Sequence, residues 1–176
     1  MMIVRASDGA DREQIFAIIN QAAQAYRGMI PADRWHDPYM PMEELEKEIA
    51  AGVAFWVAED EGEVLGVMGI QDRGDVALVR HAYVAPGTQR RGVGTTLLRY
   101  VERLTAKPIL IGTWAAAAWA IDFYRRNGYT VVPEAEKERL LRTYWSIPDR
   151  QIEASVVLAD SRWTGRMASA PTAGGE

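Results

Sequence analysis

The chain has 176 residues, of which 48% are hydrophobic and 25% are charged, a composition that suits one folded domain with a sizeable core. Its formal net charge of -4 argues against non-specific binding to nucleic acid, which needs a basic surface. The absence of cysteine excludes disulfides, thiolate catalysis and cysteine-ligated zinc, and we predict no metal site. There is no signal-peptide pattern and no apolar run long enough to span a bilayer, so we expect a soluble, cytoplasmic protein without a membrane partner.

The first part of the sequence predicts a short strand and two helices. Ile3 and Val4 can start an edge strand. Apolar residues recur at helical spacing over residues 10–26, which predicts the first helix. The second helix begins at Pro41 and ends at Gly52, and the loop before it is rich in aromatic side chains.

Three apolar runs follow, and each break between them contains acidic residues and a glycine. Such breaks are typical of tight hairpin turns. We therefore predict an antiparallel meander with strands at residues 53–58, 64–71 and 76–84.

The second half of the sequence alternates helices and strands. We predict helices at residues 93–104, 115–127 and 134–144, the last of them exposed, and strands at residues 108–113, 129–132 and 151–158. Together these elements predict an α/β (α+β) fold with a mixed, mostly antiparallel, central sheet of about six to seven strands flanked by helices. We expect one domain over residues 1–160 and a disordered tail over residues 161–176, which are rich in Gly, Ala, Ser and polar residues.

The most informative stretch is the turn that joins the last meander strand to the next helix. It runs from Gln89 to Gly94 and reads QRRGVG, with glycines that let the backbone approach a ligand closely. The first N–H groups of a helix have no partner within the helix and attract negative charge. On these residues alone, a pyrophosphate site and a plain strand-to-helix turn both stay open. The spacing fits neither a Rossmann fingerprint, which needs a third glycine, nor a P-loop, which needs a lysine.

Three linked motifs resemble those of the GNAT acetyltransferase family. The turn QRRGVG matches the family's Q/R-x-x-G-x-G/A signature and follows the V-x-P of residues 84–86. Residues 57–66 resemble the family's second hairpin, and residues 120–129 resemble its A-x-x-x-Y-x-x-x-G-F/Y segment. The resemblance covers residues 2–160 in the family's order. It implies the GNAT fold, in which two central strands splay apart and leave a slot for the cofactor.

The resemblance also implies that acetyl-CoA is the co-substrate. In the family, backbone amides of the turn hold the pyrophosphate, and the preceding strand pairs with the pantetheine arm. The matching residues of this chain are Ala82, Tyr83, Val84, Gln89, Arg90, Arg91, Gly92, Val93, Gly94 and Thr95. The sequence departs from the family at Ala117, where an asparagine often contacts the cofactor.

Two catalytic roles follow from the same resemblance. The family commonly uses the tyrosine of its A-x-x-x-Y segment to protonate the leaving thiolate, and here that residue is Tyr124. A base accepts the amine proton, often through water, and His81 is the candidate because imidazole exchanges protons near neutral pH. Two other interpretations stay open. Tyr124 can be a core aromatic residue without a catalytic role. His81 can be a strand residue that faces away from the slot, unless a β-bulge resets the alternation of side chains along its strand. Glu59 is a further candidate base, with a solvated hairpin position as its alternative.

In this fold the acceptor pocket is usually walled by the loop between the first two helices and by the last hairpin. We predict a substrate pocket formed by Tyr26, Trp35, His36 and Trp114. These aromatic side chains either stack on a flat or cationic acceptor or pack the loop against the sheet. Tyr144 and Trp145 either close the pocket from the other side or form a homodimer contact.

The sequence thus predicts an acyl-CoA-dependent N-acyltransferase of the GNAT type. We expect it to move an acetyl group from acetyl-CoA to a primary amine of a small molecule by direct attack in a ternary complex, with no nucleic-acid partner. The alternative is a non-catalytic acyl-CoA-binding regulatory or sensor protein of the same fold. A longer acyl donor also stays open.

Overall fold

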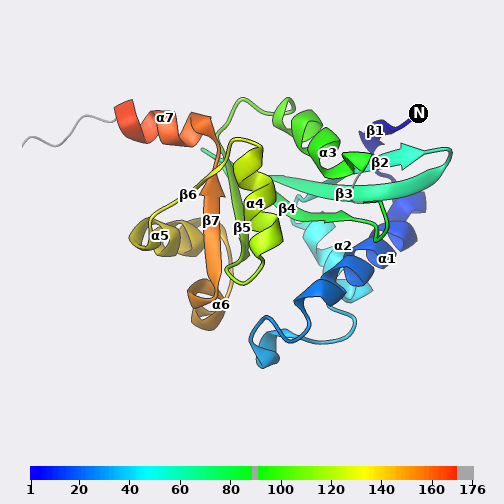
Figure 1. Ribbon diagram of the computed structural model, residues 1–176, viewed down its shortest axis with the longest axis horizontal. Helices are drawn as coiled ribbons and strands as arrows, with labels where there is room; N and C mark the ends of the chain where they lie inside the picture. Colours follow the sequence, from blue (N-terminus) through cyan, green and yellow to red (C-terminus); the bar gives the residue numbers. More distant parts are fainter. Residues whose placement is uncertain (89–90, 170–176) are drawn as a thin grey trace, which may run out of the picture.

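The computed structural model describes residues 1–88 and 91–169 (Figure 1). Its strands are β1 (Ile3–Ala6), β2 (Ala54–Asp60), β3 (Glu63–Asp72), β4 (Ala77–Val84), β5 (Ile109–Trp114), β6 (Thr130–Val131) and β7 (Ser155–Ala159). Its α-helices are α1 (Arg12–Ala22), α2 (Met42–Ala50), α3 (Val93–Glu102), α4 (Ala118–Arg126), α5 (Glu134–Tyr144), α6 (Asp149–Glu153) and α7 (Ser161–Ser169). Short 3-10 helices lie at η1 (Gly9–Asp11), η2 (Ala23–Tyr26) and η3 (Ala32–Arg34).

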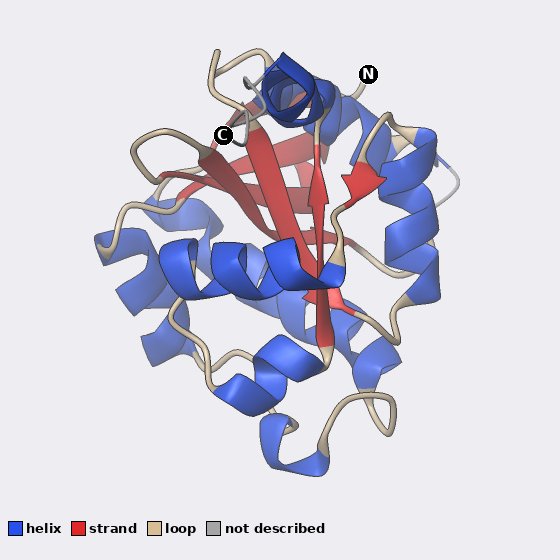
Figure 2. Ribbon diagram, turned by 90° about the vertical axis from the view of Figure 1, so that its left-hand side faces the viewer, coloured by secondary structure: helices blue, strands red, loops and turns tan. Residues whose placement is uncertain are grey.

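The strands form one 7-stranded sheet in the order β1-β2-β3-β4-β5-β7-β6. All neighbouring pairs in this sheet are antiparallel except β4 and β5, which are parallel. Figure 2 shows helices in front of the sheet and behind it. The predicted fold class is therefore confirmed, including the three-stranded meander of β2, β3 and β4.

Alternation along the strands divides the core between the two faces of the sheet. On one face, α3 and α4 cover a cluster that includes Val79, Leu97 and Ile111. On the other face, α1 and α2 cover the meander, and α5 covers a separate cluster around Leu78 and Leu110. The functional cavities described below lie between these packed regions.

Helix α3 lies unusually close to the meander because β3 has a glycine beneath it. A Cβ atom on Gly66 would lie 2.7 Å from a methyl group of Val93 and 3.1 Å from one of Leu97. No side chain fits in that space. The glycine therefore sets how closely α3 packs on the sheet, and with it the position of the turn that precedes the helix.

A β-bulge interrupts the pairing of β3 with β4 in the middle of the sheet. Val67 pairs with Tyr83 and Gly69 pairs with Arg80, so one residue of β3 lies opposite two residues of β4, His81 and Ala82. His81 has a backbone φ of 54°, in the left-handed region that non-glycine residues rarely adopt. The bulge resets the alternation of β4 at the position that the sequence left open.

Beyond this point β4 and β5 diverge. Their pairing comprises Ala77 with Ile109, Leu78 with Leu110 and Val79 with Ile111, and it stops there. The later residues of β4 pair with β3 alone, while those of β5 pair with β7. The splayed central strands that the resemblance implied are thus present.

The structure corrects three predictions in the second half of the chain. Helix α5 is not simply exposed, because Leu140 and Leu141 are buried against the sheet. The strand predicted at residues 151–158 is shorter, since residues up to Glu153 belong to α6. Helix α4 begins at Ala118 rather than at residue 115, because the N–H of Ala115 donates to the carbonyl of Ala154 across the sheet edge.

The predicted tail also begins with ordered structure. Helix α7 occupies Ser161–Ser169, and Trp163 is buried in the cluster under α5. The Asp160 side chain accepts from the N–H groups of Arg162 and Trp163, which fixes the start of the helix. The prediction of a disordered tail is therefore wrong for residues 161–169, while residues 170–176 lie outside the described part of the chain. Within that part, no helix is both long enough and apolar enough to cross a membrane.

Candidate active site

Two cavities adjoin the gap between β4 and β5. The first, here called the helix-side cavity, has a volume of about 880 Å³ and lies against the N-terminus of α3 and against α4. The second, here called the loop-side cavity, has a volume of about 250 Å³ and lies between the loop before α2, β5 and the segment that joins α5 to α6. Tyr26 and Tyr83 line both cavities, so the cavities meet at these two side chains.

The N-terminus of α3 forms one end of the helix-side cavity. Gly92 precedes the helix with φ 73°, a conformation that favours glycine, and it lines the cavity together with Gly94 and Thr95. The helix dipole and the N–H groups of the first turn favour a bound anion here. This arrangement fits the pyrophosphate of a coenzyme A thioester.

Gly94 has a packing role in addition to the predicted one. A Cβ atom at this position would lie 3.2 Å from the Phe123 ring of α4. A larger residue would push α3 and α4 apart and change the shape of the cavity between them. Spacing alone could not reveal this requirement, because it depends on a contact between two helices.

The structure separates the other residues predicted for the turn. The guanidinium of Arg91 pairs with Asp60 at 2.6 Å, and its backbone N–H donates to the carbonyl of Thr88. Val93, the first residue of α3, has a fully buried side chain, so only its backbone could face a ligand. Gln89 and Arg90 lie outside the described residues.

The end of β4 forms the floor of the helix-side cavity. Ala82, Tyr83 and Val84 line it, as predicted. The N–H of Ala85 donates to Leu65 of β3, so by alternation the polar backbone groups of Val84 point toward the open gap. An extended ligand chain could pair with them as an additional strand, which suits a pantetheine arm.

Tyr124 lines the helix-side cavity from α4 and is buried, with 6% of its surface exposed. Its ring contacts Phe123 and Tyr129. Tyr124 is therefore both an aromatic residue of the core and part of the cavity wall. Burial, together with the nearby Tyr26, raises the pKa of the Tyr124 phenol above its usual value. The hydroxyl therefore carries its proton at neutral pH and is available as a donor.

Tyr26 occupies the junction of the two cavities. Its hydroxyl shares hydrogen bonds with the side chains of Tyr83 and Thr113, which tie η2 to both splayed strands. Burial raises the pKa of Tyr26, and these hydrogen bonds offset only part of that effect. The prediction that Tyr26 lies at the substrate pocket thus agrees with its position.

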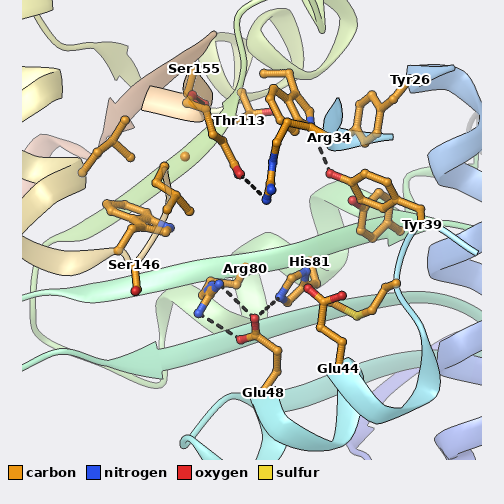
Figure 3. Close-up of a pocket in the computed structure, with 18 of the residues that line it drawn as sticks. Tyr26, Arg34, Tyr39, Glu44, Glu48, Arg80, His81, Thr113, Ser146 and Ser155 are labelled. Atoms are coloured by element: carbon orange, nitrogen blue, oxygen red, sulfur yellow. Dashed lines mark hydrogen bonds and ion pairs between the residues drawn. The ribbon is translucent and has the colours of Figure 1, made fainter. Parts of the chain in front are cut away.

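The loop-side cavity holds His81 beside a carboxylate (Figure 3). Because of the bulge, the His81 ring stacks on Phe55 and turns toward α2, where its Nε2 lies 3.7 Å from Oε1 of Glu48. Glu48 also pairs with Arg80 at 3.0 Å. Burial raises the pKa of Glu48, but His81 and Arg80 outweigh this effect and the net pKa is lowered. Glu48 is therefore a carboxylate that can stabilise a proton on His81.

The three other residues predicted for the substrate pocket fall into two groups. Trp114 and His36 line the loop-side cavity, whereas Trp35 does not and instead stacks on Tyr39 from behind. The Trp114 indole donates to the Tyr39 hydroxyl at 3.0 Å, and burial raises the pKa of Tyr39 to about 12. The aromatic loop thus packs against the sheet and walls a cavity at the same time.

Several residues of this cavity were absent from the sequence prediction. They are Arg34, Glu44, Glu48, Arg80, Gln151 and Ser155. Their elements are far apart in the sequence, and charged residues on loops and helices have no spacing that marks a cavity. Trp145 differs from these residues, because one of its two sequence interpretations already placed it at the pocket. In the structure it lines the cavity and lies over Gly112.

Glu59, the other candidate base, lies elsewhere. Its carboxylate pairs with Arg5 of β1 at 2.6 Å, and it lines neither cavity. Tyr144 donates to Asp75 and also lines neither cavity. His81 is the better-placed proton acceptor of the two candidates.

Comparison with known proteins gives a consistent result. Residues 51–131 match the family described as "Acetyltransferase (GNAT) domain". Among curated proteins, the chain is 28% identical over 116 residues to the peptidyl-lysine N-acetyltransferase YiaC of Escherichia coli (strain K12), an overlap of 66% of this chain and 75% of that protein.

Solved structures with the same fold include two N-acetyltransferases. The PaiA N-acetyltransferase of Thermoplasma acidophilum, in complex with coenzyme A, has a TM-score of 0.69 and 16% identity, covering 91% of this chain and 98% of that chain. The ribosomal-protein-S18-alanine N-acetyltransferase of Escherichia coli has a TM-score of 0.63 and 16% identity, covering 91% and 93%. At these identities the likeness concerns the fold. Taken with the family match over residues 51–131 and the three linked motifs, it confirms the resemblance of the chain to the GNAT acetyltransferase family.

Proposed function

We propose that this GNAT acetyltransferase moves an acetyl group from acetyl-CoA to a primary amine of a small molecule. The observation that carries the proposal is the meeting of two different cavities at Tyr26 and Tyr83. The larger cavity has a helix N-terminus and an unpaired strand edge, which suit coenzyme A. The smaller one contains a histidine next to a carboxylate, which suits an amine that must lose a proton.

Acetyl-CoA supplies a thioester, whose acetyl carbon accepts the amine lone pair as the bond to sulfur breaks. The chain's own residues position the reactants and handle the protons. His81 accepts the proton that the amine loses, directly or through water, and Glu48 stabilises the imidazolium that results. Tyr124 donates its proton to the departing thiolate. The tyrosinate then recovers a proton from solvent.

The size and shape of the loop-side cavity favour a small acceptor. Its volume of about 250 Å³ lies just below the usual range of ligand pockets, roughly 300–1,000 Å³. Charged and aromatic side chains close it on several sides (Figure 3). The similarity to a peptidyl-lysine N-acetyltransferase makes a lysine side chain of a protein the second candidate acceptor.

The test is release of free coenzyme A thiol from acetyl-CoA in the presence of amino acids, polyamines, aminoglycosides, and peptides with a free N-terminus or lysine. We expect acetylation of one or more small amines, with the product confirmed by mass spectrometry. Exclusive acetylation of peptide lysines would replace the small-molecule acceptor. Tight acetyl-CoA binding with no turnover on any amine would favour the alternative, an acyl-CoA sensor of the same fold.

A further inference from the structure

We propose that the acceptor carries a carboxylate as well as its amine, and that Arg34 binds this carboxylate, so that the substrate class is a free amino acid. This inference rests on the proposed function and specifies its acceptor. The observation behind it is an uncompensated guanidinium inside the loop-side cavity.

Arg34 belongs to the 3-10 helix η3 and lines the cavity (Figure 3). Its Nη2 donates to Oε1 of Gln151 at 2.9 Å, whereas its Nε is buried and makes no hydrogen bond. Across residues 1–88 and 91–169, no carboxylate lies within 4.0 Å of this guanidinium. A partly buried cation without a counterion is costly unless a ligand completes it.

Two acidic side chains also line the cavity, both from α2. Glu48 is balanced by Arg80 and faces His81. Glu44 is exposed to solvent, and it lies beside Glu48 in Figure 3. Neither carboxylate is within ion-pair distance of Arg34, and a guanidinium fork matches a carboxylate in a bidentate pair.

The two ends of the cavity have different chemistry. Figure 3 shows Arg34 entering from the side opposite Glu48 and His81. An acceptor whose carboxylate contacts Arg34 can therefore present its amine toward His81 and the gap. Aromatic side chains of Tyr39, Trp114 and Trp145 line the cavity and are available to contact the amino-acid side chain.

Two contacts with α6 fix the position of Arg34. Gln151 belongs to α6, and the neighbouring Asp33 pairs with Arg150 of the same helix at 3.3 Å. These two contacts join the aromatic loop to α6 across the cavity. A site for a carboxylate is therefore held in place before a ligand arrives, which lowers the entropic cost of binding.

The experiment compares the twenty L-amino acids with their carboxamides, which keep the amine and lose the negative charge. We expect acetylation of at least one free amino acid, with kcat/KM at least tenfold above that of its carboxamide. Arg34→Gln should lower kcat/KM for the free acid to the level of the carboxamide and change the carboxamide value less than twofold. Arg27→Gln is the matched control, because Arg27 lies on the same loop over Trp35 and does not line the cavity.

A second readout is independent of turnover. The same amino acids should raise the melting temperature of the wild-type protein and not that of Arg34→Gln. If amines are acetylated but carboxamides and acids react equally, the proposed function stands and this inference fails. If no amine is acetylated but amino acids bind through Arg34, the inference stands and the proposed function fails. If no amino acid is either acetylated or bound, the inference is overturned.

Discussion

The two cavities are built in different ways. The helix-side cavity takes much of its lining from residues that are close in the sequence, at the end of β4 (Ala82, Tyr83 and Val84) and at the start of α3 (Gly92, Gly94 and Thr95). Residues of α1, η2 and α4 form its other walls. The loop-side cavity is formed by side chains from η3, α2, β4, β5 and the segment around α6, more than a hundred residues apart. A site made of local backbone can be found in a sequence motif, whereas a site made of distant side chains cannot.

The same difference bears on what each cavity can bind. Main-chain groups at a helix N-terminus recognise a feature common to many ligands, a phosphate, and they tolerate most changes of side chain. In the proposed acceptor site, recognition would instead depend on individual side chains such as His81 and Arg34, which a single substitution alters. We therefore expect proton acceptance and acceptor specificity to depend on the loop-side cavity, and cofactor affinity and protonation of the thiolate to depend on the helix-side cavity.

The largest expected effect is on proton acceptance. His81→Gln should lower kcat by about 100-fold or more, since a positioned general base typically contributes 10²–10⁴-fold. The acetyl-CoA dissociation constant should change little, because His81 lies in the other cavity. Steady-state kinetics and calorimetry measure the two quantities.

The chain provides its own control for this variant. His36 is the only other histidine, lines the same cavity, and has its Nδ1 2.8 Å from the carbonyl of Pro38. His36→Gln should leave kcat within a few-fold of the wild type. Equal losses in both variants would remove the special role of His81.

The next effect concerns the leaving group, in the helix-side cavity. Tyr124→Phe should lower kcat by roughly 10–100-fold, because the proton donor for the thiolate is lost while the ring still packs. Tyr129→Phe is the matched control, since its ring lies 5.9 Å from that of Tyr124 but its hydroxyl donates to Glu102, away from the cavity. An unchanged kcat for Tyr124→Phe in a single-turnover measurement would remove the general-acid assignment.

A smaller effect is expected from charge placed at the helix N-terminus. Gly92→Asp should weaken coenzyme A binding by about tenfold, or about 1.4 kcal/mol, because a carboxylate would repel the pyrophosphate. Gly92→Asn is the control, since asparagine has the same shape and tolerates the φ of 73° equally well. Calorimetry that gave the two variants the same affinity would contradict a diphosphate at this turn.

The smallest effect concerns stability in the loop-side cavity. The folded-state pKa of Glu48 is lowered, so its stabilising contribution is present above the unfolded pKa of about 4.3 and is lost as the pH falls through the lower folded value. Glu48→Gln should therefore reduce the free energy of unfolding by about 1 kcal/mol at pH 7 and by a smaller amount near pH 3. Urea denaturation at both pH values tests this expectation. If Glu48→Gln lowered the free energy of unfolding by the same amount at both pH values, the ion pairs of Glu48 would contribute nothing to stability.

The sequence by itself determined the meander, the order of the elements and the turn before α3. These features rest on local rules, namely apolar periodicity, turn residues and the glycines at 92 and 94. The resemblance to the GNAT family, rather than these rules, selected Ala82, Tyr83, Val84 and Tyr124, which line one cavity. The motif carried this information because its residues are neighbours in the chain or in one helix.

Only the tertiary structure decided the rest. The bulge that turns His81 toward Glu48 depends on how β4 pairs with β3, and the burial of Trp163 depends on space left under α5. The meeting of Arg34 with Gln151 joins residues 117 positions apart. Contacts of this kind follow from three-dimensional packing rather than spacing, which is why Glu48 and Arg34, both proposed for the acceptor side, were found from the fold and not from the sequence.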